Sequence, residues 1–475
     1  MENDSKINAH TKSFGVRAKK LKLTFVSGVT TVTGANFLLE TVPETGELAV
    51  RILIDCGLEQ GTRESEINNR KSFPYDVSSI DYLFITHAHI DHIGRVPKLV
   101  KDGFKGKIFS TQETHKLAPI MLEDSMKVFK MDQGEFEPLY DEKDIEDSMS
   151  LWHDIPYDTC TDIKGGIQVC AKDAGHILGS VMYEFTYNGK KIIFTGDLGN
   201  SPTPLLRDTA VITDATYLVM ESVYGDRNHE STEERRDMLE NIIEDASKRK
   251  GALIIPCFSL EKAQVLLYEI NHLVEEGRVA PMPVYLDSPL AIKVTEIYRG
   301  RSRGFNEEVR QEMQKDENIF SFPRLTKIMT AEESKKLIDT PNPKIIIAGS
   351  GMSSGGRIIH HEINYLPDPN STLLLTGYQS IGTLGRHIQD GAKTVTIFGN
   401  EVAVRANIVA IDGYSSHKDS DHLLAFVSDT RDTLKKVFVV MGEPKAALFL
   451  TQKIQDNLAV EAYHPQSGET VVLDF

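Results

Sequence analysis

The segment from Thr86 to His92 limits the folds open to this chain more narrowly than any other part of the sequence. It reads Thr86-His87-Ala88-His89-Ile90-Asp91-His92 and directly follows the apolar run Tyr82–Ile85. Three imidazoles and one carboxylate at the end of a buried strand form a set of nitrogen and oxygen ligands that suits zinc. A solvated polar loop would explain one histidine at a strand end, but not this pattern. The segment therefore predicts a metal site at the end of a buried strand.

Two later segments each place one more ligand type between glycines. His176 lies in Gly175-His176-Ile177-Leu178-Gly179, and Asp197 lies in Gly196-Asp197-Leu198-Gly199 at the end of an expected strand. Either segment alone would more often be an ordinary turn. Together with the histidine run they complete a ligand set for two metals, with Asp197 as the bridge. We expect one metal on His87, His89 and His176, and the other on Asp91 and His92.

The bulk composition sets wider limits. A length of 475 residues allows two or three domains. The net charge of -16 argues against holding nucleic acid by bulk electrostatics, although metals and a few clustered cations could supply local positive charge. No apolar run is long enough to span a bilayer, and the polar N-terminus is no secretory signal. We therefore expect a cytoplasmic location, no membrane partner and a flexible tail over residues 1–20.

Four cysteines occur in the chain, at Cys56, Cys160, Cys170 and Cys257, and no CxxC pair is present. So few cysteines in so long a chain do not indicate a disulfide framework. We expect all four to be small buried hydrophobic residues in a reducing compartment.

The pattern of apolar residues changes at about Tyr224. Before it, short runs rich in β-branched and aromatic residues predict strands at Leu21–Val26, Asn36–Leu39, Ala49–Asp55, Tyr82–Thr86, Gly166–Ala171, Val181–Phe185 and Lys191–Thr195. After it, strands alternate with helices, which indicates a parallel α/β sheet: Ala252–Pro256, Glu261–Ile270, Pro283–Leu286, Lys344–Ala348, Arg357–Tyr365 and Thr372–Leu375. Capping boxes at Ser110–Glu113 and Ser231–Glu234 each predict the start of a helix.

These motifs resemble a known family. The run HAHIDH with Asp55, His176 and Asp197 resembles motifs one to four of the metallo-β-lactamase superfamily. Glu221-Ser222-Val223-Tyr224-Gly225-Asp226 and Gly413-Tyr414-Ser415-Ser416-His417-Lys418-Asp419 resemble motifs A and B of its β-CASP branch, whose members process RNA or DNA. Further similar stretches are Ile255–Leu260, Leu286–Ala291, Gly351–Arg357 and Gly377–Gly385.

The resemblance implies an α/β protein: an αββα metallo-β-lactamase sandwich with an inserted α/β β-CASP domain built on a parallel sheet. We expect the sandwich to use residues 21–223 and 413–475, and the β-CASP domain to use residues 224–412. The active site should lie in the cleft between them. Asp55 ends an expected strand and could hydrogen-bond a ligand histidine.

The implied activity is that of a zinc-dependent ribonuclease, similar to the cleavage and polyadenylation specificity factor nuclease and to bacterial and archaeal β-CASP ribonucleases. Metal-activated hydroxide would hydrolyse phosphodiester bonds of single-stranded RNA, as an endonuclease, a 5′-exonuclease or both. The catalytic residues would be Asp91, Asp197, Glu221 and His417, with His417 as a general acid or phosphate contact oriented by Glu221. Cleavage of DNA and assembly as a homodimer stay open.

A glycine-rich loop from Gly349 to Arg357 runs from an expected strand into an expected helix. Its backbone N–H groups and its arginine could bind a backbone phosphate of the substrate. The residues expected to do so are Ser350, Gly351, Ser353, Ser354, Gly355 and Arg357.

Two positions depart from the family pattern. RNA-cutting members carry a metal-binding histidine in motif C, where this chain has Met441 in Val440-Met441-Gly442-Glu443. A thioether is a poor zinc ligand, so we expect a weaker second site, which manganese could also occupy. The family often has Gly-Arg where this chain has Glu261-Lys262, which alters a positive edge of the cleft.

Two competing functions remain from the sequence. A promiscuous hydrolase of small esters or amides, including β-lactams, would share the metal motifs but lacks the inserted domain that motifs A and B indicate. A weakly active scaffold in an RNA-processing complex would usually have lost several metal ligands, whereas only motif C departs here.

Overall fold

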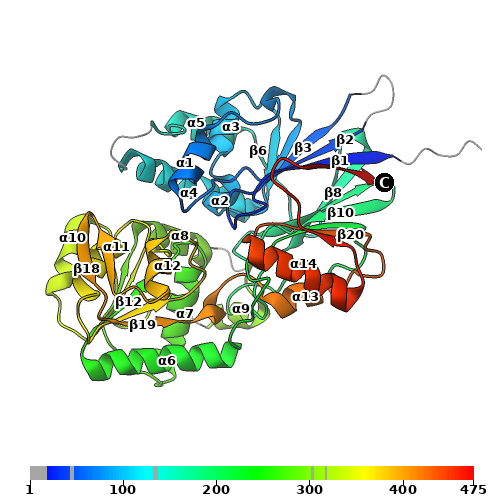
Figure 1. The fold of residues 1–475 in the computed structure, drawn as a ribbon. Coiled ribbons are helices and arrows are strands. Elements are labelled where there is room, and N and C mark those ends of the chain that lie inside the picture. Colours follow the sequence, from blue (N-terminus) through cyan, green and yellow to red (C-terminus); the bar gives the residue numbers. More distant parts are fainter. Residues whose placement is uncertain (1–18, 43–47, 132–136, 301–303, 316–317) are drawn as a thin grey trace, which may run out of the picture.

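Two seven-stranded sheets form the centre of the larger part of the molecule (Figure 1). The computed structural model describes residues 19–42, 48–131, 137–300, 304–315 and 318–475; the expected tail lies almost wholly outside them. The first sheet runs in the order β22 (Thr470–Asp474), β1 (Lys20–Ser27), β2 (Asn36–Thr41), β3 (Arg51–Ile54), β4 (Tyr82–Phe84), β5 (Lys107–Ser110) and β6 (Trp152–Asp154). The second runs β21 (Ala462–Tyr463), β20 (Lys436–Val439), β11 (Tyr217–Met220), β10 (Lys190–Phe194), β9 (Val181–Tyr187), β8 (Ile167–Asp173) and β7 (Cys160–Ile163).

The two sheets pack face to face, and the side chains between them form one core. β1 alternates between buried and more exposed side chains, whereas inner strands such as β2 are buried on both faces. In β1, Leu21, Leu23 and Phe25 are fully buried and share one core with residues of the second sheet such as Phe185 and Phe438. Alternation of this kind is what a strand with one face on a core requires. The layer between the sheets is therefore the main core of this domain.

Helices cover the two outer faces. On the first sheet they are α1 (Arg63–Arg70), α2 (Ile90–Ile93), α3 (Val96–Lys101), α4 (Gln112–Met131) and α5 (Glu142–Ser150). On the second they are α13 (Ser420–Ser428) and α14 (Pro444–Leu458), whose Leu423 and Leu450 pack against Leu218 and Val437. This confirms the expected αββα sandwich.

A separate parallel sheet forms the inserted domain, below the sandwich in Figure 1. Its order is β14 (Leu325–Lys327), β13 (Val284–Asp287), β15 (Lys344–Ala348), β12 (Ala252–Pro256), β16 (Thr372–Leu375) and β19 (Asn407–Ala410), and every pairing is parallel. β17 (Thr394–Ile397) and β18 (Asn400–Ala403) form a separate hairpin. The domain's helices are α6 (Thr232–Arg249), α7 (Lys262–Glu275), α8 (Pro289–Arg299), α9 (Glu307–Met313), α10 (Ala331–Lys336), α11 (Ile358–Tyr365) and α12 (Leu384–Gln389). The parallel α/β sheet expected after Tyr224 is thus confirmed.

Of the two expected capping boxes, one is confirmed and the other is wrong. Ser231 and Glu234 form the expected capping box of α6, with both hydrogen bonds present. The other box is wrong, because Ser110 is the last residue of β5 and Thr111 caps α4 instead, accepting from Thr114 N. α4 begins at Gln112, so the N-cap position falls on Thr111, and Ser110 Oγ instead accepts from Trp152 Nε1.

The cysteine expectation also needs correction. Cys56 and Cys257 are buried free thiols, as expected. Cys160 and Cys170, however, are joined by a disulfide. They lie directly opposite each other in the antiparallel pair β7–β8, where paired Cα atoms come close enough for this bond.

Among the described helices, none is long and apolar enough to cross a membrane.

Candidate metal centre

The predicted ligands meet at one end of the two central sheets. The histidine run leaves β4 and enters α2, whose N-cap is His89. His176 comes from the loop between β8 and β9, and Asp197 lies three residues after the end of β10. Both loops contain glycines with positive φ, Gly175 and Gly196, and an added Cβ there would lie under 3.0 Å from neighbouring atoms. The tight turns that present these two ligands therefore depend on glycine.

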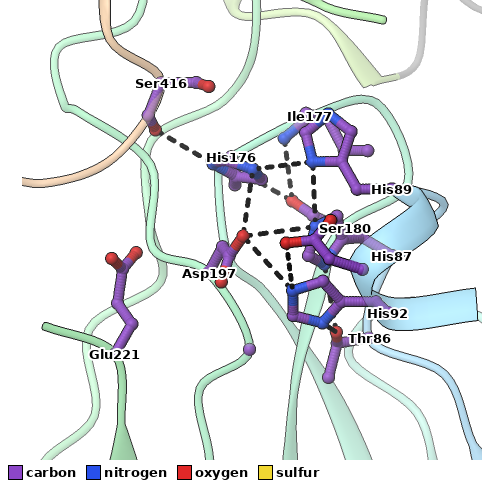
Figure 2. Close-up of polar contacts among 12 residues, drawn as sticks. Thr86, His87, His89, His92, His176, Ile177, Ser180, Asp197, Glu221 and Ser416 are labelled. Atoms are coloured by element: carbon purple, nitrogen blue, oxygen red, sulfur yellow. Dashed lines mark hydrogen bonds and ion pairs between the residues drawn. The ribbon is translucent and has the colours of Figure 1, made fainter. Parts of the chain in front are cut away.

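His87, His89, His176 and Asp197 form the first ligand group (Figure 2). One ligand atom from each lies within 4.8 Å of all the others. His89 Nδ1 is 3.1 Å from His87 Nε2 and 3.2 Å from His176 Nε2. Three nitrogens and one oxygen at such distances from one another match the ligand set of a zinc ion.

Asp91, His92 and Asp197 form the second group. His92 Nε2 lies 3.4 Å from Asp197 Oδ2 and 3.8 Å from Asp91 Oδ2. His92 Nε2 and Asp197 Oδ1 are buried and have no hydrogen-bond partner among the described residues. Because a buried polar atom without a partner is costly, these two atoms fit a site that a cation completes. The donor set thus fits a divalent metal, and Asp197 faces both positions.

The protonation of the first group also suits metal binding. Burial lowers the pKa of His87 to about 4 and holds the pKa of His89 and of His176 well below the ordinary value. Neutral imidazole is the form that ligates a metal. His92 differs: burial alone would lower its pKa, but the carboxylates of Asp197, Asp55 and Asp91 raise it well above the ordinary value.

Neighbouring groups fix the orientation of two ligand rings. Asp55 Oδ2 lies 2.8 Å from His92 Nδ1, and Asp55 also accepts from Thr86 N and Thr86 Oγ1, both at 2.8 Å. His176 Nδ1 donates to the carbonyl of Ser416 at 3.1 Å. Such contacts hold a ligand ring so that its other nitrogen faces the metal. Sequence reasoning missed Thr86 and Ser416, and only their places within the two motifs could have drawn attention to them.

Glu221 and His417 lie beside the ligands and form a third group with Asp197. Glu221 follows β11, is fully buried and accepts from Leu198 N. His417 Nδ1 lies 3.1 Å from Glu221 Oε2, and the rings of His417 and His176 have centroids 4.6 Å apart. Burial alone would lower the pKa of His417, but the carboxylates of Glu221 and Asp197 raise it to about 9. A histidine with this pKa is protonated near neutral pH and can donate a proton.

The glycine-rich loop is closed largely by its own hydrogen bonds. Ser350 N donates to Gly355 O, Ser353 N donates to Ser350 O, and Ser354 N donates to Ser350 Oγ. The guanidinium of Arg357 donates to Asp287 and to the carbonyls of Ile328 and Met329. Arg357 is therefore committed to holding the loop, and a substrate role for the loop stays a prediction.

Met441 is buried and has a positive φ of 49°. Its N–H donates to Gly28 O, and an added Cβ on Gly28 would lie 2.7 Å from its sulfur. The same added Cβ would also meet Ala35, whose N–H donates to the carbonyl of Asp91. Met441 thus packs against the turn that supports the second group.

Another imidazole, His422, is half exposed, pairs with Asp419 and joins none of the ligand groups of the described residues.

Three family models match the chain. The metallo-beta-lactamase superfamily domain matches residues 46–224, and the Beta-Casp domain matches residues 263–388. The Zn-dependent metallo-hydrolase RNA specificity domain matches residues 401–465. The three matches follow one another along most of the chain, and the ligands, Glu221 and His417 fall inside the first and third.

Individual proteins are also similar. Ribonuclease TTHA0252 of Thermus thermophilus is 35% identical over 401 residues, which cover 84% of this chain and 89% of that protein. Transcription termination factor FttA of Methanosarcina mazei is 30% identical over 470 residues, which cover 95% and 72%. A crystal structure of a protein of unknown function from Enterococcus faecalis V583 superposes with a TM-score of 0.57 at 14% identity, covering 96% of this chain and all of that one. The last match shows a shared fold alone.

Proposed function

The chain belongs to the β-CASP branch of the metallo-β-lactamase superfamily, and we propose that it is a metal-dependent nuclease that hydrolyses phosphodiester bonds of single-stranded RNA. One observation carries the proposal: His417, paired with Glu221, lies against a buried ligand group. The ribonuclease similarity and the RNA specificity match favour RNA as the substrate. Zinc is the metal that the three imidazoles of the first group favour.

The residues divide the chemistry between them. The two ligand groups would hold a metal, which would activate a water and offset charge on the phosphoryl oxygens. Asp197 belongs to both ligand groups and so links the two metal positions, while Asp91 and His92 complete the second group. His417 donates its proton to the oxygen that leaves the phosphorus, and Glu221 keeps that imidazole charged and oriented.

Cationic side chains beside aromatic rings favour a nucleic-acid substrate in spite of the net charge of -16. A recess between the sandwich and the inserted domain is lined by Arg227, Arg386, Lys445 and Tyr378, along with Asp226 and Glu443. Asp226 pairs with Arg227 and Lys445, and Asp390 pairs with Arg386. Arg227 also lies over the rings of Tyr224 and Tyr378. Cations beside an aromatic ring are the usual means of holding a single strand.

The competing functions fit less well. His92 Nε2 and Asp197 Oδ1 are buried and have no hydrogen-bond partner in the described part of the chain. A scaffold without a metal would bear the cost of these atoms with nothing to offset it. A small-ester hydrolase does not need the inserted domain, whose residues approach the ligand loop: Tyr298 Oη accepts from Leu178 N, two residues after His176.

End-labelled single-stranded RNA and DNA of the same sequence, incubated with and without added zinc, test the proposal. We expect RNA to be cut, cutting to stop with a chelator and to return with zinc. Fragment lengths then report whether cleavage is internal or from the 5′ end. Intact RNA in the presence of zinc, or cleavage that a chelator does not change, would contradict the proposal.

A further inference from the structure

Glu261 has a backbone conformation that residues other than glycine rarely adopt. Its φ is 65° and its ψ is -54°, and Lys262 N donates to Leu260 O at 2.9 Å, so these three residues form a γ-turn at the start of α7. A γ-turn with positive φ at its central residue is rare and strained when that residue carries a Cβ. Glu261 stands where the family pattern often has glycine, which would avoid this strain.

The carboxyl group of Glu261 is also buried, and two ordinary explanations for it fail. It does not cap α7, although Glu261 occupies the N-cap position, and it does not hydrogen-bond Lys262, whose Nζ has no hydrogen-bond partner among the described residues. Burial raises the pKa of Glu261 to about 7, although the hydroxyl of Tyr298 and the N–H of Leu178 act to lower it. Because both the γ-turn and the burial are unfavourable, the side chain needs a contact that offsets them.

That contact is the hydroxyl of Tyr298. Tyr298 lies on α8 of the inserted domain, is fully buried and donates from Oη to Glu261 Oε2 at 2.6 Å. The same oxygen accepts from Leu178 N at 3.2 Å. A tyrosine hydroxyl has one proton and can rotate, so an acceptor for the proton also decides where the oxygen lone pairs point. Glu261 therefore holds the Tyr298 oxygen in the orientation that accepts from Leu178.

Leu178 belongs to the loop that presents the metal ligand His176 (Figure 2). His176 N and Ile177 N donate to Ser180 Oγ at 3.0 and 3.3 Å, and Ser180 N donates to Ile177 O. These bonds stay inside the loop, whereas the bond from Leu178 N reaches the inserted domain. The Tyr298 hydroxyl thus attaches the ligand loop of the sandwich to the inserted domain.

The side chain of Leu178 is held from the same direction. An added Cβ on Gly304 of the inserted domain would lie 2.4 Å from Leu178 Cδ1, and Leu178 shares a core with Tyr298 and Phe305. α8 also packs against α4 of the sandwich, at the side of the inserted domain that faces it (Figure 1). The inserted domain therefore contacts Leu178 through backbone and side chain, two residues from a metal ligand.

We propose that Glu261 and Tyr298 position the His176 loop from the inserted domain, so that the metal affinity of the first ligand group depends on this contact between the domains; this rests on the proposed function. Neither residue belongs to a ligand group, and both act through the N–H of Leu178. Groups that hold a ligand in place typically contribute tenfold or more to metal affinity. A hydroxyl that only stabilised the fold would change the Tm and leave the zinc affinity unchanged.

Zinc affinity of the full-length protein tests the proposal without any need for cleavage. It is measured by competition with a chelator whose absorbance changes when it binds zinc. Tyr298→Phe keeps the ring and removes the hydroxyl, so the Kd of the first zinc should rise about tenfold. The matched control is Tyr268→Phe, which removes a hydroxyl that donates to Glu312 at 2.9 Å in the same domain and should leave the Kd unchanged. An unchanged Kd in Tyr298→Phe, or an equal rise in both variants, would overturn the proposal.

Two substitutions of Glu261 test its part. Glu261→Gln retains an oxygen that accepts from Tyr298, so it should keep the zinc Kd of wild type. Glu261→Gly relieves the strained γ-turn but removes the acceptor, so its zinc Kd should rise although the strain is gone. A wild-type Kd in Glu261→Gly would show that the carboxyl group does not position the loop.

Cleavage kinetics separate this proposal from the proposed function. Tyr298→Phe should cut RNA more slowly than wild type at limiting zinc and approach the wild-type rate at saturating zinc, with KM little changed, because His176 is still present. A loss of rate that saturating zinc does not reduce would overturn the proposal. If the zinc Kd depends on Tyr298 and Glu261 but no RNA is cut, the positioning contact stands and the proposed function fails.

Discussion

The three histidines of the first ligand group and His417 lie a few ångströms apart in this molecule and differ in protonation. Around the first metal position, burial keeps His87, His89 and His176 neutral. His417 is equally buried, but Glu221 and Asp197 raise its pKa to about 9. The ring of His176 and the ring of His417 are separated by 4.6 Å. Carboxylates therefore distinguish His417 from the three imidazoles of the first ligand group. His92, whose pKa Asp197, Asp55 and Asp91 also raise, has to lose its proton before it can bind a metal.

The comparison predicts that substitution of the ligand histidines lowers both bound metal and cleavage, whereas substitution of His417 lowers cleavage alone. Replacing His87 and His89 by Ala removes two of the three neutral nitrogens, so metal binding and hydrolysis should both be lost. Elemental analysis measures the bound zinc, and cleavage of labelled RNA measures the activity. A double variant with undiminished zinc would show that the ligand assignment is wrong.

His417→Ala should leave the metal in place and lower the cleavage rate by about a hundredfold or more, the usual scale for a lost acid. The measurement is kcat together with zinc content and Tm. Near-normal cleavage would show that His417 is structural and would remove the contrast between the two groups.

Glu221→Gln should have a smaller effect on rate and a clear effect on pH dependence. His417 must be protonated to act, so wild-type cleavage should fall as pH rises through about 9. Without the negative charge of Glu221, the pKa of His417 falls and this alkaline limb moves to lower pH. An unchanged pH profile would mean that Glu221 does not set the charge of His417.

Met441→His should have the smallest effect, and it concerns the second ligand group. That group offers Asp91, His92 and the shared Asp197, and His92 must first lose its proton to bind a metal. We expect fewer than two zinc per wild-type chain at low metal and a value closer to two in the variant, with a shift toward RNA over DNA. Zinc titration of both metal-free proteins is the measurement. Equal, tight binding of two zinc by both would contradict the expected weak site.

The sequence was most informative where ligands are close together in the chain. His87, His89, Asp91 and His92 lie within six residues, and His176 and Asp197 stand between glycines that tight turns require. Alternation of strands and helices was likewise sufficient to predict the parallel sheet of the inserted domain.

Features that depend on pairing between distant segments were missed. β11 was not predicted, because Tyr217–Met220 is a short apolar run whose role depends on β10 and β20 on either side. The Cys160–Cys170 bond depends on the register of β7 and β8 about the Gly165-Gly166 turn, and that symmetric spacing was the available signal.

Glu221 and His417 are 196 residues apart in the chain, although their side chains touch. The ribosome adds all six ligand positions before it reaches the inserted domain, and His417 follows only after that domain. During synthesis, the nascent chain therefore carries a full ligand set well before it carries its acid. Any chain cut short before Gly413 would therefore hold the six ligand positions without His417, the residue proposed to supply the proton.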